Sequence, residues 1–166
     1  MDTQRTQEAE KSCLELQDAL SKQLPPEIHH KMLPASRTIA LRQTSRLCCA
    51  SKALAETLLL NTTVTSLDLY NNDLGEGGGR ALAETLRLNT TLTSLDLGFN
   101  DLGEGGGRVL AKTLRLNTTL TSLDLFGNGL GEGGGRAFAE TLRLNSTLTS
   151  LGLCNWLFHL LRGCQR

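Results

Sequence analysis

The sequence predicts an α/β solenoid, a fold that stacks many copies of one short unit made of a strand and a helix. Two observations lead to this prediction. A 28-residue stretch from Leu60 to Arg87 recurs with few changes over 88–115 and 116–143, and a chain that repeats at a fixed short period stacks its units side by side. Within each unit the apolar residues first alternate, as in a strand, and then recur every four residues, as in a helix.

The first half of each unit predicts a short strand. Leu67 and Leu69 alternate with polar residues, which is the pattern of a strand with one buried face. The apolar positions follow L-x-x-L-x-L-x-x-N-x-L, and the asparagine falls where the chain turns off the strand, at Asn72, Asn100 and Asn128. We expect these asparagines to point inward as a structural ladder that bonds unpaired backbone groups of the neighbouring turn.

The second half of each unit, Glu76 to Arg87 in the first copy, predicts a helix. Gly78, Leu82 and Leu86 fall on one apolar stripe. The successive glycines at the helix start are expected to allow close approach of helix and strand. An asparagine follows each helix, and it is expected to end the helix in the left-handed conformation; these residues are Asn61, Asn89, Asn117 and Asn145.

A strand and a helix at this period form the leucine-rich-repeat pattern. The motif N-x-L-G-E-x-G-x-R-A-L-A-E-x-L resembles the long, helix-containing repeats of ribonuclease inhibitor, NOD-like receptors and the Ran GTPase-activating protein. This resemblance covers roughly Ala50 to Leu153. It implies a short right-handed solenoid with parallel strands on a concave face, helices on a convex face and an N-terminal helical cap.

The chain is expected to divide into three parts. Residues 51–61 match 79–89 almost letter for letter, so the repeats are expected to begin with a helix whose strand half is missing or replaced. The expected order is an N-terminal helical segment over 1–50, a helix half-repeat over 51–60, full repeats over 60–87, 88–115 and 116–143, a terminal strand within 144–153, and a cap or truncated tail over 154–166.

The N-terminal part admits two interpretations. An apolar stripe from Gln7 to Leu24 predicts a helix, either a cap on the first repeat or a helix for a partner or coiled coil. Leu24 to Ala50, with L-P-P-E-I and T-I-A-L-R-Q-T-S-R, resembles the start and middle of an F-box. An F-box is a small helical module that docks a substrate receptor onto a cullin-type ubiquitin ligase. Cys48 and Cys49 stand where an F-box has an aromatic residue, so a plain helical cap remains the alternative.

Composition excludes several classes of function. The formal net charge is zero, which argues against nucleic-acid binding, and no apolar run is long enough to span a membrane. Five cysteines without a C-x-x-C pair and a polar N-terminus without a signal sequence fit a cytoplasmic protein. The glycine-rich stretch matches no phosphate-binding template. No catalytic set or cluster of metal ligands stands out, so we expect no enzyme activity, cofactor or metal.

The concave face carries the candidate binding residues. Asp68, Asp96 and Asp124 recur at one strand position, either as a solvated face or as an acidic stripe for basic side chains of a partner. Three of the six differences between the second and third copies lie together at the strand exit. Aromatic residues gather there, either through drift between duplicates or as binding anchors. These aromatic residues are Tyr70, Phe99, Phe126 and, in the fourth copy, Trp156.

These observations favour a monomeric, non-catalytic module that binds a partner protein on its concave face, as the resemblance to NOD-like receptors implies. The main alternative is an F-box-like substrate adaptor of a cullin-type ubiquitin ligase. A third possibility, activation of a GTPase, is less favoured because the Ran activator has many more repeats and a long acidic tail.

Overall fold

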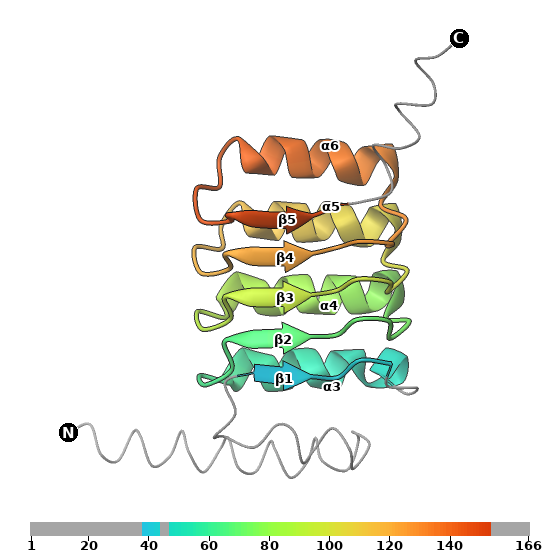
Figure 1. Cartoon of the computed structure of the whole chain (residues 1–166), viewed down its shortest axis with the longest axis vertical. Helices are drawn as coiled ribbons and strands as arrows, with labels where there is room; N and C mark the ends of the chain where they lie inside the picture. Colours follow the sequence, from blue (N-terminus) through green and yellow to red (C-terminus); the bar gives the residue numbers. More distant parts are fainter. Residues whose placement is uncertain (1–37, 44–46, 154–166) are drawn as a thin grey trace, which may run out of the picture.

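The computed structural model describes residues 38–43 and 47–153 of the chain. Strands and helices alternate along this part, and Figure 1 shows them as two layers, with the strands in one and the helices in the other. In chain order the elements are β1 (Thr38–Ala40), α3 (Leu47–Leu60), β2 (Ser66–Asp68), α4 (Gly75–Leu88), β3 (Ser94–Asp96), α5 (Gly103–Leu114), β4 (Ser122–Asp124), α6 (Gly131–Leu142) and β5 (Ser150–Gly152).

The strands form one parallel sheet in the order β1-β2-β3-β4-β5. Each residue pairs with its equivalent one repeat later, so that Leu67 lies beside Leu95 and Leu95 beside Leu123. This register keeps equivalent side chains of successive repeats in rows across the sheet. The predicted α/β solenoid, with parallel strands on one face and helices on the other, is confirmed.

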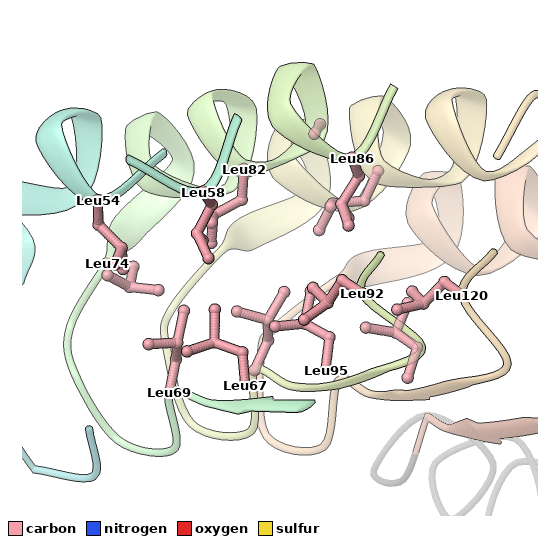
Figure 2. Packing of buried hydrophobic residues seen from close by; sticks show 14 of the residues in the cluster. Leu54, Leu58, Leu67, Leu69, Leu74, Leu82, Leu86, Leu92, Leu95 and Leu120 are labelled. Carbon is pink, nitrogen blue, oxygen red and sulfur yellow. The ribbon is translucent and has the colours of Figure 1, made fainter. Parts of the chain in front are cut away.

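The hydrophobic core lies between the two layers. Figure 2 shows leucine side chains of the strand and helix layers pointing toward one another. Leu67 and Leu95 of the strands and Leu82 of α4 are each no more than 2% exposed. The predicted helical stripe is also confirmed, because Gly78, Leu82 and Leu86 are all buried.

The sheet begins one strand earlier than we expected. Ile39 of β1 pairs with Leu67, and Leu41 is 1% exposed. The strand half before α3 is therefore present, and the expectation that it was missing or replaced was wrong. Ile39-x-Leu41 keeps the apolar alternation, but Thr44 stands where later copies have the asparagine. A part of the F-box-like segment is thus a repeat strand, while 24–37, the helix expected over 7–24 and the tail 154–166 lie outside the described residues.

The asparagines that follow the strands bond the turns of neighbouring repeats together. Asn100 Nδ2 donates to the carbonyls of Leu69 (2.8 Å) and Leu97 (2.9 Å), and its Oδ1 accepts the backbone N–H of Asn72 at 3.1 Å. Asn128 repeats this arrangement one unit later. Because each asparagine amide serves two successive turns, the ladder ties the repeats together along the solenoid axis.

The asparagines that follow the helices are not in the left-handed conformation we expected. Asn89 has a φ of −72° and a ψ of 128°. Its Oδ1 accepts the N–H groups of Thr91 (3.0 Å) and Leu92 (2.8 Å), while its Nδ2 donates to the carbonyl of Leu58 at 2.8 Å. An extended backbone places the side chain to form this turn. These residues therefore form a second ladder at the other end of the repeats.

The glycines at the helix starts bring neighbouring helices together, whereas we expected them to bring helix and strand together. A Cβ atom on Gly78 would lie 2.8 Å from the Cβ of Leu74 and 3.3 Å from that of Ser51 in α3. A Cβ on Gly79 would lie 3.5 Å from the Cα of Gly106 in α5. Successive helices can pack this closely because at least one of the two helices has a glycine at each contact.

Candidate functional site

The turn after each strand takes a backbone conformation that L-residues rarely adopt. In each repeat three alternate residues have positive φ angles: Asn71, Asp73 and Gly75; Phe99, Asp101 and Gly103; and Gly127, Gly129 and Gly131. Glycine, asparagine and aspartate tolerate this region, but phenylalanine does not. Phe99, with a φ of 55°, and Gln43, with a φ of 52° at the equivalent position two repeats earlier, are the exceptions, and Phe99 is the aromatic one. Its position carries a strain of about 1–2 kcal/mol.

Three aromatic rings form a row in the turns just after β2, β3 and β4, at the edge of the open sheet face, which is the side of the sheet turned away from the helices and expected to be concave. We call Tyr70, Phe99 and Phe126 the aromatic row. The Tyr70 and Phe99 ring centroids are 5.3 Å apart in an edge-on arrangement, and those of Phe99 and Phe126 are 5.0 Å apart. Phe99 is 41% exposed, although it is large and apolar. The row offers a continuous aromatic surface to solvent.

Two glycines give the aromatic row its space. A Cβ on Gly98 would lie 3.0 Å from Cδ2 of Tyr70, and a Cβ on Gly127 would lie 2.9 Å from Cδ1 of Phe99. The Tyr70 and Phe99 rings therefore lie over the backbone of the next repeat. Gly-Phe in the second unit and Phe-Gly in the third are the sequence difference that permits this stacking.

A row of aspartates lies beside the rings. Asp68, Asp96 and Asp124 are register partners in β2, β3 and β4. Each Oδ1 accepts the backbone N–H of the residue two positions on, at 3.1 Å for Tyr70, 2.8 Å for Gly98 and 2.8 Å for Phe126. Asp124 is the most exposed of the three. The bonds fix the carboxylates next to the aromatic row.

Sequence reasoning missed Arg42, which interacts with both rows. Its guanidinium forms a hydrogen-bonded ion pair with Asp68, lies 3.7 Å from Oδ2 of Asp96, and is 5.3 Å from the ring centroid of Tyr70. The 28-residue register could have revealed it, because Arg42 precedes Tyr70 by one repeat. We had assigned this residue to the F-box-like segment. Arg42 partly neutralises the first two aspartates of the row.

The middle aspartate is the one whose protonation is perturbed. Partial burial raises the pKa of Asp96, and the carboxylates of Asp68 and Asp124 raise it further. The backbone N–H of Gly98 and the charge of Arg42 oppose this rise in the Asp96 pKa. Burial of the Asp96 carboxyl group is thus the main cause of the rise in its pKa, and the like charges of its two neighbours in the row add to it.

Other surfaces of the described residues show less chemistry. An open groove between α5 and α6 is lined mainly by charged side chains of both signs, such as Glu104, Arg108 and Glu132. A second open groove, between α3 and α4, also includes the apolar side chains of Leu59 and Leu88. Within 38–43 and 47–153 no group of three His, Cys, Asp or Glu residues could hold a metal ion. No helix in the same ranges is long and apolar enough to cross a membrane. Trp156 lies outside the described residues.

Comparison with known sequences identifies the repeat. The Leucine Rich repeat family matches residues 60–83, 88–111 and 116–139. Together with the parallel sheet and its layer of helices, these matches show a leucine-rich-repeat fold. The matched ranges begin at equivalent positions in the three full repeats. The structure adds to them the strand β1 and helix α3 of a further leucine-rich repeat at the N-terminal side.

Solved structures share this leucine-rich-repeat fold. "Leiomodin-1 Actin-Binding Site 2 (ABS2)" is 22% identical with a TM-score of 0.70, covering 90% of this chain and 84% of that one. The tropomodulin C-terminal domain from Caenorhabditis elegans is 13% identical with a TM-score of 0.68, covering 86% and 83%. At these identities the likeness concerns the fold alone. Among curated proteins, none matches the sequence.

Proposed function

We propose that this leucine-rich-repeat protein is a non-catalytic binding module that holds a partner protein against the aromatic row on the open sheet face. The proposal includes a repeat arrangement of the NOD-like-receptor type, which the motif resembles. Leucine-rich repeats typically provide extended surfaces of this kind. Asp124 and the aromatic row would form the centre of the contact.

Phe99 is the observation that carries the proposal. It is 41% exposed and holds a positive φ of 55°, so a large aromatic side chain is left partly open to solvent on a strained backbone. The third copy has Gly127 at this position, which fits the same turn without strain. A strained backbone at an exposed aromatic residue supports a functional role, because aromatic anchors carry much of the binding energy at interfaces.

The test exchanges residues between the repeats of the chain itself. A double variant with Phe99→Gly and Phe126→Gly gives each position the residue found in the neighbouring copy. A matched control is Leu116→Ala, which removes an apolar side chain that is 71% exposed and lies just after α5. We expect proteins captured from cell extract by the wild type and the control to be missing with the double variant. Equal capture by all three chains would contradict the assignment to the aromatic row.

Actin is a second candidate partner. The leiomodin-1 structure, whose title names an actin-binding site, aligns with 90% of this chain at a TM-score of 0.70. Co-sedimentation with filamentous actin tests this candidate directly. We expect the wild type to pellet with the filaments and the double variant to remain in the supernatant. If the wild type remains in the supernatant as well, actin filaments are not the partner.

The F-box-like alternative needs a deletion that respects the sheet. Removing Leu24 to Ala50 would also remove β1, including the buried Ile39 and Leu41, and would expose the core. Deletion of residues 1–36 keeps β1 in place. Loss of captured cullin-ligase components with this deletion would support the adaptor function. Capture that is unchanged by the deletion favours the repeats as the binding element.

A further inference from the structure

We propose that the partner presents an arginine whose guanidinium pairs with Asp124 and lies against the Phe126 ring. This inference rests on the proposed function, because it places the partner on the open sheet face. It adds the chemical group that the face recognises. The argument comes from an arginine of the chain itself, Arg42, that already occupies the equivalent place two repeats earlier.

Arg42 shows how this surface binds a guanidinium. The group is hydrogen-bonded to Asp68 and lies 5.3 Å from the centre of the Tyr70 ring. The Asp68 carboxylate is held in place by the backbone N–H of Tyr70. A planar guanidinium can pair with a carboxylate and stack on a ring at once, whereas the ammonium of lysine does so less well.

The carboxylate and the ring of this arrangement recur two repeats later at Asp124 and Phe126, where Phe99 also packs against the Phe126 ring. These residues lie two repeats after Asp68 and Tyr70, and the Asp124 carboxylate accepts the N–H of Phe126 at 2.8 Å. The residue two repeats after Arg42 is Gly98, which has no side chain to pair with Asp124. The chain therefore supplies the carboxylate and the ring of the site, while its own sequence omits the cation.

The electrostatics favour an added cation at this place. Asp124 is exposed, and within 38–43 and 47–153 it forms no ion pair. Arg42 is the cation that pairs with the aspartate row in those ranges, and it contacts Asp68 and Asp96 at the other end. Phe99 lies against Phe126 with ring centroids 5.0 Å apart, which adds aromatic surface but no charge. An arginine of a partner would complete the row.

The experiment is a titration of the isotope-labelled full chain with N-acetyl-arginine amide, followed by backbone amide chemical shifts. N-acetyl-lysine amide is the matched probe, and Asp124→Asn is the matched variant. We expect saturable shifts centred on the amides of Gly98, Asp124 and Phe126. We also expect the arginine probe to bind more tightly than the lysine probe, and the variant to bind the arginine probe about fivefold more weakly.

Three results would overturn the inference. The first is the absence of localised shifts, and the second is equal binding of the arginine probe by the variant. The third is that the arginine probe causes no shifts in the wild type but does so in a variant with Arg162→Gln and Arg166→Gln. An arginine of the chain itself would then occupy the site at Asp124 and Phe126. Capture by the aromatic row is a separate measurement with variants that keep Asp124. It can therefore succeed where this titration fails, so failure of the inference can be distinguished from failure of the proposed function.

Discussion

Replacing Asn128 with alanine tests how the repeats are held together. Asn128 is 2% exposed, and its Oδ1 accepts the backbone N–H groups of Asn100 at 3.1 Å and Leu102 at 3.3 Å. Its Nδ2 donates to the carbonyls of Leu97 at 2.7 Å and Leu125 at 3.0 Å. Alanine cannot replace these bonds, so two buried N–H donors would lose this acceptor.

The expected cost follows from those two donors. A buried donor without a partner costs about 1–3 kcal/mol, so Asn128→Ala should lower the free energy of unfolding by about 2–6 kcal/mol. That is a large share of the roughly 5–15 kcal/mol that stabilises a typical domain. Urea unfolding followed by circular dichroism measures the loss. With a slope of about 1–3 kcal/mol per molar urea, the midpoint should fall by roughly 1 M or more.

Thr118→Ala is the control, because Thr118 is exposed in the loop between α5 and β4. It should stay within about 0.5 kcal/mol of the wild type. If Asn128→Ala also unfolds within about 0.5 kcal/mol of the wild type, the ladder does not tie the repeats together, and the account of the fold is wrong on this point.

Three further predictions concern stability in urea unfolding. Gly77→Ala should raise the free energy of unfolding by up to about 1 kcal/mol, since nothing lies within 4 Å of the added Cβ. Gly78→Ala should instead lower it by about 1–3 kcal/mol, because the added Cβ would lie 2.8 Å from the Cβ of Leu74. Burial raises the pKa of Asp96, so its ionisation opposes folding. Asp96→Asn should therefore raise the urea midpoint of unfolding at pH 7. The difference in midpoint between the wild type and the variant should vanish below about pH 4, where the aspartic acid and the asparagine are both neutral. An unchanged midpoint at pH 7 would contradict this. Phe99→Gly should leave stability within about 1 kcal/mol, because relief of strain offsets the lost ring contacts, and a larger loss would show that Phe99 is a core residue.

The repeat itself made most of the fold predictable. A fixed period with Leu67-x-Leu69 in each strand and Leu82 four residues before Leu86 in each helix determines both layers and their register. β1 was missed because the motif beyond Leu41 has diverged and lacks the asparagine. The asparagines that follow the helices were assigned the wrong backbone conformation, because propensity alone does not show that a side chain bonds two residues ahead.

The candidate site was predictable in its members but not in its geometry. The spacing placed Asp68, Asp96 and Asp124 in one row, since parallel strands keep equivalent residues side by side. Stacking of the aromatic row depends on the left-handed turn at Phe99, which no sequence pattern announces. Arg42 could be placed only after β1 was recognised as a strand of the same sheet.

The affinity of the captured partner for the double variant Phe99→Gly and Phe126→Gly tests the central claim most directly. The account predicts a fold that unfolds cooperatively, with affinity at least about 30-fold below that of the wild type, as expected when about 2 kcal/mol of anchor energy is lost. The Leu116→Ala control should bind like the wild type. Wild-type affinity in the double variant would contradict the claim that the aromatic row binds the partner.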